Sequence, residues 1–265
     1  MTAKPTAHGW LYDTLRSTRR IASRCRTRLF RRFGLLGEDW RAALPEELQF
    51  WEKALSDPDR NWLRSDYDER MNPDLEFQDY LKALIDAPPG ATVRALDVGA
   101  GPLTRLGKRW TGRTLQLVAV DPLADEYKIL LARLGIRPPV FTEVGHGEKL
   151  RERFEANSFD IAYASNALDH SYDPLLAIEQ MFSVIKPQRY VYLWHFAHVG
   201  VAEGYSGLHQ WNFDIKHGDM ILSNGRGLRH ELGVAFKGRG EVTCAFEEFA
   251  GHRVVVAKLK KLRPD

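Results

Sequence analysis

Short apolar runs alternate with helical patterns from residue 91 to the C-terminal end of the chain. The runs are rich in Val, Leu and Ile, which is typical of strands that are buried on both faces. Apolar residues recur at helical spacing over 124–134 and 175–185, and a further helix is predicted over 103–110. The predicted strands lie at 95–98, at 115–120, at 140–144, within 157–174, at 190–195 and at 253–258. This alternation predicts an α/β fold built on a mostly parallel sheet.

Residues 1–90 carry helical patterns without strand-like runs. Helices are predicted over 45–55, where a proline and two acids stand in the first turn, and over 75–85. The sequence Pro-Pro-Gly at 88–90 then marks the clearest boundary in the chain. We therefore predict a helical N-terminal region, 1–90, ahead of a strand-rich domain, 91–265.

A basic amphipathic arm is predicted over 10–36. Apolar residues recur there every three or four positions, and arginines fill the other faces. Such a helix fits an anionic membrane surface, on which the protein would make a peripheral contact. It equally fits a helix that docks on the rest of the protein and keeps an arginine-rich face in solvent. A targeting presequence is a third interpretation, but no cleavage site supports it.

The composition is that of an ordinary globular protein with one good core: 265 residues, 44% of them hydrophobic and 28% charged. The net charge of +3 is uneven, since residues 1–40 carry +6 and the rest carry −3. Cys25 and Cys244 form no Cys-x-x-Cys pair, which favours a reducing compartment without a zinc cluster. No apolar run approaches a membrane span or a secretory signal, so a cytoplasmic location is predicted and a homodimer stays open.

A glycine turn follows the first predicted strand of the domain, where 96–101 reads Leu-Asp-Val-Gly-Ala-Gly. Glycine lacks a Cβ and lets the backbone approach a ligand, and Pro102 suits the first turn of a helix. Dinucleotide turns carry a third glycine beside a pyrophosphate, but Thr104 stands at that position. Asp97 would repel a pyrophosphate, whereas it suits a ligand with an ammonium group.

A second acid, Asp121, ends the next predicted strand, 20 residues after Gly101. In nucleotide-binding strand–helix–strand units an acid at this place accepts hydrogen bonds from the ribose diol. The alternative is an N-cap for the helix over 124–134. We favour the ribose contact because the flanking motifs agree with it.

Four blocks between residues 94 and 195 resemble, in order and spacing, the class I S-adenosylmethionine-dependent methyltransferases, and within them the small-molecule enzymes called type 11. The glycine turn matches the family's acid-x-Gly-x-Gly motif, with the acid of the second strand as the next block. Residues 145–150 read Gly-His-Gly-Glu-Lys-Leu, where the family has Gly-Asp-Ala-Glu-x-Leu. Residues 157–174 contain Asn-Ser-Phe-Asp and then Leu-x-His-x-x-Asp-Pro. The resemblance implies a doubly wound, seven-stranded, mostly parallel Rossmann-like sheet.

The resemblance also implies S-adenosylmethionine as the cofactor, bound at the carboxyl ends of the first two strands of the methyltransferase domain. His146 stands where the family usually has Asp, which is a departure at the adenine contact. The implied cofactor-binding residues are Asp97, Gly99, Ala100, Gly101, Pro102, Asp121, Pro122, Leu123, His146, Gly147, Glu148, Ser165 and Asn166.

Histidines on the acceptor side are candidates for the general base that a hydroxyl acceptor requires. His170 is the first candidate because it follows the fourth strand, and Asp169 would orient it or serve as the base itself. His195, His198 and His209 lie further along the chain and are alternative bases.

A divalent metal ion is an alternative use of these residues. Asp169 and His170 would hold it together with one of the other histidines and Glu203. However, no spacing among them is a recognised ligand signature, and most such histidines bond within the protein. A divalent metal ion is therefore possible but not signalled by the sequence, and no metal ligands are assigned.

A loop-rich insertion over 197–227 follows the fifth strand, where the fold places substrate. Aromatic residues alternate there with His, Gln and Asn, which suits a ligand with many hydroxyl groups. The alternative is a structural loop pinned by Trp211. The candidate substrate residues are Glu203, Tyr205, Gln210, Trp211 and Asn212.

Together these patterns predict an S-adenosylmethionine-dependent O-methyltransferase that acts on a small-molecule hydroxyl, foremost on a sugar or glycan intermediate. Nucleic acid is disfavoured as a substrate, because residues 165–168 read Ser-Asn-Ala-Leu instead of the Asn/Asp-Pro-Pro-Tyr amine clamp, and the basic arm lacks interleaved stacking aromatics. Methylation of a carboxylate or an amine stays open, as does a cofactor-binding module without turnover.

Overall fold

The computed structural model describes residues 36–57 and 64–263. The predicted basic arm over 10–36 therefore falls almost entirely outside the described residues. Within them, no helix combines the length and the apolar character that a bilayer span requires.

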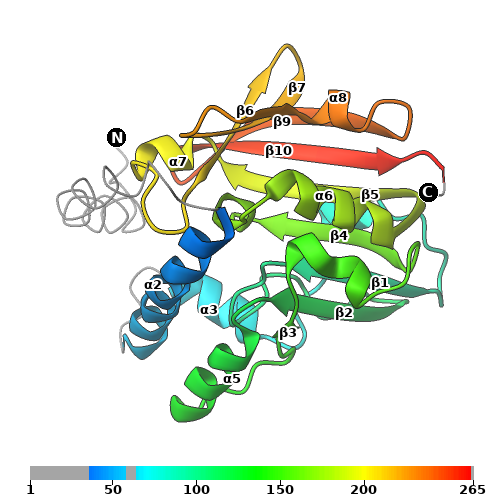
Figure 1. Ribbon diagram of the computed structural model, residues 1–265. Coiled ribbons are helices and arrows are strands. Elements are labelled where there is room, and N and C mark those ends of the chain that lie inside the picture. Colours follow the sequence, from blue (N-terminus) through cyan, green and yellow to red (C-terminus); the bar gives the residue numbers. More distant parts are fainter. Residues whose placement is uncertain (1–35, 58–63, 264–265) are drawn as a thin grey trace, which may run out of the picture.

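The centre of the molecule is a seven-stranded sheet in the order β3-β2-β1-β4-β5-β10-β9, which confirms the doubly wound methyltransferase-type sheet (Figure 1). Strands β1 to β5 pair in parallel, whereas β10 runs antiparallel to both of its neighbours. The strand bounds are β1 Thr92–Val98, β2 Thr114–Asp121, β3 Glu143–Val144, β4 Phe159–Ser165, β5 Ile185–Phe196, β9 Gly240–Phe249 and β10 His252–Lys261.

Both faces of the central strands are buried, which explains why their sequences read as continuous apolar runs. On one face, α6 packs its Ile178, Met181 and Phe182 against β4 and β5. On the other face, Phe77 and Leu81 of the N-terminal region pack against β1 and β4. The helices are α2 Leu36–Ser56, α3 Arg64–Met71, α4 Asp79–Lys82, α5 Ala124–Arg133, α6 Pro174–Val184, α7 Val199–Ala202 and α8 Leu232–Ala235, with short 3₁₀ turns η1 Gly147–Glu152 and η2 Leu168–His170.

Several predicted elements match the structure closely, including the helices over 124–134 and 175–185. The helix predicted over 103–110 is wrong, because this segment forms turns. Its backbone bonds to the N-terminal region instead: the N–H groups of Lys108 and Arg109 donate to the carbonyl of Leu75 at 2.8 and 3.2 Å. Pro102 therefore opens no helix.

The same pairing shortens the helix predicted over 75–85 to α4, because residues 75–77 run alongside 108–109 as an isolated bridge. The strand predicted over 140–144 is reduced to the two residues of β3. Since Phe77 and Leu81 share a core with β1 and β4, this part of the N-terminal region packs directly on the sheet. The division at residue 90 stays a prediction.

The insertion over 197–227 is more ordered than predicted. It contains α7 and two strands of a second, three-stranded antiparallel sheet, β6-β7-β8. Phe213 and Leu222 of this small sheet join the core on the α6 side of the main sheet. The strands are β6 Trp211–Lys216, β7 Asp219–Asn224 and β8 Arg229–Glu231.

Candidate active site

The glycine turn lies between the carboxyl ends of β1 and β2. Gly99 and Gly101 have φ angles of +73° and +63°, in the left-handed region that glycine tolerates best. A Cβ on Gly99 would stand 2.4 Å from the Cβ of Ala167, and one on Gly101 would stand 2.9 Å from the indole of Trp51. Both positions therefore require glycine for their φ and for the close approach of a neighbour.

Asp97 is buried at the end of β1, with 3% of its surface exposed. It accepts a hydrogen bond of 2.6 Å from the hydroxyl of Thr104, in the segment that replaces the predicted helix. Burial raises the pKa of Asp97 to about 6, although the Thr104 bond and the charge of Arg70 partly oppose this shift. The carboxylate is thus held in place beside the turn and would gain from a cationic ligand.

Asp121 lies on the neighbouring strand and faces the same turn. Its two carboxylate oxygens accept hydrogen bonds from the N–H groups of Gly101, at 3.1 Å, and Leu123, at 2.9 Å. Burial raises the pKa of Asp121 to about 7, and the charge of Asp97 adds to the shift. The two acids therefore come together at the ends of adjacent strands, as the sequence predicts. Their contacts with the ammonium group and the ribose stay predictions.

These two raised pKa values give a testable pH dependence. Because the folded protein holds protons on Asp97 and Asp121 that the unfolded chain has lost, its free energy of unfolding falls as the pH rises from about 4 to about 7. An ammonium ligand needs Asp97 ionised, so its affinity rises with pH through about 6, by up to about tenfold per unit below that value. Calorimetry with S-adenosylhomocysteine and thermal unfolding across this range measure both slopes. An affinity independent of pH would contradict the contact with Asp97.

Helix α2 covers this end of the sheet, where the arrowheads of β4 and β5 point in Figure 1. Its Trp51 packs on Gly101 and donates a hydrogen bond of 2.8 Å to Glu47. Its Trp40 donates a bond of 2.7 Å to the carbonyl of His170. The sequence analysis missed these residues, because the helical pattern of α2 indicates burial without saying which surface the helix covers.

Arg70 of α3 is another residue that the sequence analysis missed. It is buried, and its guanidinium donates to the carbonyl of Leu103 next to the glycine turn. Burial lowers the pKa of Arg70 to about 10, and the nearby Arg105 lowers it further, whereas the charge of Asp97 raises it. A cation therefore stands beside Asp97. No local sequence signal marks it, because the contact depends on how α3 docks.

Several buried polar atoms near the carboxyl ends of the strands have no hydrogen-bond partner within the protein. Such atoms would fit a polar ligand such as a nucleoside cofactor. Buried polar groups normally have hydrogen-bond partners, so such a concentration marks a place for a polar ligand. Asn166 also has a φ of +47°, a conformation that a functional site commonly imposes. The atoms are His146 Nδ1, Ser165 Oγ, Asn166 Oδ1, Asp169 Oδ1 and both ring nitrogens of His195.

The loop at 145–150 lies beside this group. Burial lowers the pKa of His146, so its ring is neutral and its Nδ1 is free to bond a ligand. A carboxylate oxygen of Glu148 accepts hydrogen bonds from the hydroxyl of Ser171 and from the N–H of Tyr172, the latter at 3.1 Å. Glu148 thus also braces the segment ahead of α6, while its predicted adenine contact is untested.

Three of the four predicted catalytic residues form one cluster. His209 Nδ1 lies 2.7 Å from Asp169 Oδ2 and 3.0 Å from His170 Nε2. Asp169 is fully buried, and although burial would raise its pKa, the two imidazoles lower it well below the ordinary value. Burial lowers the pKa of His209, but the hydrogen bond to Asp169 more than offsets this effect, so the pKa of His209 is raised. The cluster therefore holds two imidazoles, which can accept a proton, against one carboxylate that stays ionised.

His195, the fourth, lies outside this cluster. Its ring stacks on Phe213 with centroids 4.2 Å apart, and none of its surface is exposed. Burial lowers its pKa to about 4, so the ring is neutral. His198 is half exposed and faces Asp214 at 3.5 Å. Of the alternative bases, His209 is the one that the structure brings to His170.

The predicted substrate residues of the insertion are mostly bonded to one another. Asn212 donates to the hydroxyl of Tyr205 at 2.8 Å and accepts from the N–H of Val201 at 2.8 Å. Gln210 donates to the carbonyls of Tyr205 and Gly207 at 2.9 and 2.8 Å. Trp211 is buried in the core. These four side chains therefore support the structural interpretation of the loop. Glu203, which is half buried, acts electrostatically on His209.

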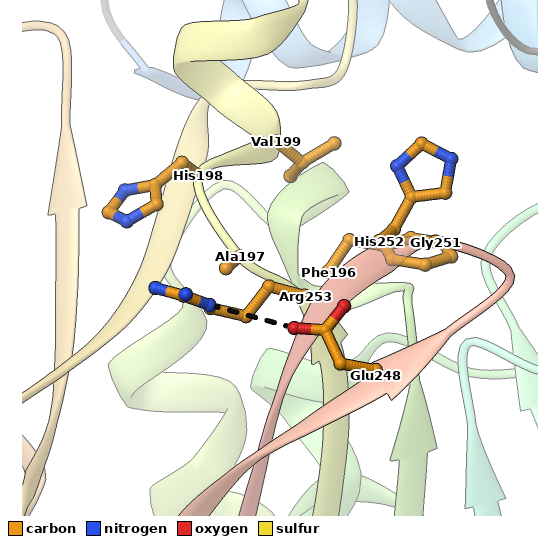
Figure 2. Close-up of a pocket in the computed structure, with 8 residues that line it drawn as sticks. All are labelled: Phe196, Ala197, His198, Val199, Glu248, Gly251, His252 and Arg253. Carbon is orange, nitrogen blue, oxygen red and sulfur yellow. Dashed lines mark ion pairs between the residues drawn. The ribbon is translucent and has the colours of Figure 1, made fainter.

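A pocket of about 360 Å³ opens at the end of β5, next to the end of β9 and the start of β10 (Figure 2). His198, His252 and the ion pair of Arg253 with Glu248, at 3.9 Å, contribute its polar lining. This hollow is not predictable from the sequence, because its walls come from three strands, and β5 meets the other two only in the folded sheet.

The comparisons with known proteins agree with this arrangement. Residues 96–193 match the family model of a methyltransferase domain. No protein with a curated description matches the chain. Among solved structures, the chain is similar to 1,6-didemethyltoxoflavin-N1-methyltransferase of Burkholderia thailandensis, with 15% identity, a TM-score of 0.47, and coverage of 87% of this chain and 92% of that one. It is also similar to an S-adenosylmethionine-dependent methyltransferase of Methanosarcina mazei, with 16% identity, a TM-score of 0.44, and coverage of 71% of this chain and 100% of that one. A third similar structure is an S-adenosylmethionine-dependent methyltransferase of Aquifex aeolicus, with 16% identity, a TM-score of 0.43, and coverage of 81% of this chain and 97% of that one.

The sheet order and the acid–glycine turn give the chain the fold of the class I S-adenosylmethionine-dependent methyltransferases, and residues 96–193 match a methyltransferase domain. The methyltransferase-domain match indicates an enzyme with S-adenosylmethionine as its cofactor. The atom that receives the methyl group is the subject of the proposal below.

Proposed function

We propose that the protein transfers the methyl group to a hydroxyl oxygen of a small molecule, and that Asp169, His170 and His209 activate this hydroxyl. The observation that carries the proposal is the convergence of two imidazoles on one buried carboxylate, within 2.7–3.3 Å, just after β4. Contacts through α2 support the placement, because Trp51 touches Gly101 and bonds Glu47, whose other oxygen lies 3.6 Å from His170.

When bound, S-adenosylmethionine supplies a methyl group on a positively charged sulfur. The hydroxyl oxygen forms the new bond to this methyl carbon, while the carbon–sulfur bond breaks and its electron pair stays on the sulfur. The hydroxyl proton passes to the cluster, which releases it to solvent. Alignment of the oxygen with the methyl group supplies much of the acceleration, and proton removal adds to it.

The proton acceptors favour a hydroxyl over the rival acceptors. A carboxylate is already ionised at neutral pH and requires no base. The ammonium form of an amine loses its proton more readily than an alcohol does. The neutral amine is then itself a nucleophile, so it depends less on a base. The sugar preference has weaker support than the hydroxyl, since the side chains that suggested it bond within the loop.

An acceptor screen with labelled S-adenosylmethionine tests the proposal. Phenols, sugars and other alcohols are compared with amines and carboxylic acids of similar shape, and the product is analysed for O-methyl or N-methyl groups. We expect label in alcohols or phenols, and slower transfer in His170→Ala. Transfer to amines or carboxylates alone, unaffected by this substitution, would show that the proposal is wrong.

A further inference from the structure

We propose that Asp169, His170 and His209 form a binding site for a divalent transition-metal ion. The ligand atoms are Asp169 Oδ2, His170 Nε2 and His209 Nδ1, which lie within 4.8 Å of one another. Two imidazoles and one carboxylate are the ligand set of metal sites that keep open positions for a substrate. The sequence does not signal this site, because the two histidines stand 39 residues apart and match no recognised ligand spacing.

The spacing of the three atoms fits a single ion. The separations are 2.7 Å between His209 and Asp169, 3.0 Å between the two histidines, and 3.3 Å between His170 and Asp169. Ligands about 2.0–2.1 Å from one ion in octahedral or tetrahedral geometry stand about 2.9–3.4 Å apart. The triangle therefore needs only small adjustments to place all three atoms on one ion.

Hydrogen bonding alone does not account for this triangle. If both facing ring nitrogens carry a hydrogen, the contact between the histidines sets one hydrogen against the other. If only one carries it, the other nitrogen turns its lone pair toward Asp169 Oδ2 or toward its partner ring. In each arrangement at least one of the three contacts is repulsive, whereas a cation attracts all three lone pairs.

The surroundings supply what a metal site requires. Glu47 Oε2 lies 3.6 Å from His170 Nδ1, the ring nitrogen that faces away from the triangle, and a carboxylate at this place orients a metal-bound histidine. The fully buried Asp169 has a second oxygen, Oδ1, without a hydrogen-bond partner. The N–H of Gln210 donates to the carbonyl of Asp169 at 3.1 Å, which fixes the two segments on each other.

Imidazole ligands favour zinc, iron, cobalt or nickel over magnesium or calcium, which prefer oxygen. With an ion bound, the three ligand atoms would no longer accept the hydroxyl proton. The ion would instead bind the acceptor oxygen at an open position and lower the pKa of its hydroxyl, and solvent would take the proton. This catalytic use rests on the proposed function, but the existence of the site does not.

Metal titration of the full-length protein tests the inference. After removal of bound metal with a chelator, Co²⁺ is added and its visible absorption is followed, and Zn²⁺ binding is measured by calorimetry. We expect about one ion per chain, and an affinity at least about 100-fold weaker in the double variant His170→Ala/His209→Ala. His198→Ala is the matched control, because this half-exposed histidine pairs with Asp214 outside the cluster.

Retained binding of S-adenosylhomocysteine shows that the double variant is folded. Should it not fold, the X-ray absorption spectrum of the native Co²⁺ protein replaces it, with two imidazole ligands expected. Absence of stoichiometric binding, equal binding by the double variant, a loss in His198→Ala as large as in the double variant, or a spectrum without imidazole ligands would each overturn the inference. If the protein binds no metal but methylates hydroxyls, the metal site is wrong and the proposed function stands. If it binds the metal but methylates only amines, the metal site stands and the proposed function is wrong.

Discussion

Asp97→Asn weakens the binding of S-adenosylmethionine and S-adenosylhomocysteine by about 100-fold, on the order of 3 kcal/mol. The substitution keeps the size of the side chain and an oxygen that accepts the bond from Thr104. It removes only the negative charge that faces the cofactor's ammonium group. Calorimetry with S-adenosylhomocysteine gives the affinity directly.

This loss will not come from unfolding. Asp97 is ionised at a cost in the folded protein, as its raised pKa indicates, so the neutral amide leaves the stability at neutral pH unchanged or increases it. The control is Asp125→Asn on α5, whose carboxylate is 71% exposed and pairs with Lys128. Equal cofactor affinities in Asp97→Asn and the native protein would show that Asp97 does not contact the ammonium group.

Asp169→Asn lowers kcat by a factor of about 10²–10⁴ and leaves the affinity for the cofactor nearly unchanged. Its carboxylate is the group on which both imidazoles converge, and an amide neither holds them in this arrangement nor balances their charge. Turnover is measured with the acceptor that the screen identifies, and S-adenosylhomocysteine affinity is measured alongside it.

The matched control for this substitution is Asp214→Asn, which removes a carboxylate that pairs with a histidine outside the cluster. We expect its kcat to stay within about twofold of the native value. The melting temperature shows whether Asp169→Asn is folded. If the folded variant has the native kcat, the cluster does not activate the acceptor.

The positions of Asp97, the glycine turn and Asp121 could be predicted from sequence, because they depend on local order. One strand, one turn and the tip of the next strand place Asp97, the glycines and Asp121, and parallel neighbours bring their carboxyl ends to one edge. Helices α5 and α6 were predicted for the same reason, since their apolar spacing and their caps are local properties.

The remaining parts depend on contacts that are distant in sequence. Residues 103–110 have helical spacing, yet Leu103 packs in the core of α2 and α5 while Leu106 and Trp110 pack against the sheet. A Cβ on Gly107 would stand 2.1 Å from the carbonyl oxygen of Glu76, so the backbones approach too closely for a helix with side chains there. His209 reaches His170 only because the insertion folds back onto the segment that follows β4. No local sequence pattern predicts this contact.

Helix α2 touches both halves of the chemistry, through Trp51 on the glycine turn and through Trp40 and Glu47 at His170. One helix thus contacts both the glycine turn and the cluster that contains His170. We therefore expect a substitution that loosens the packing of α2 to weaken cofactor binding and to slow methyl transfer at the same time.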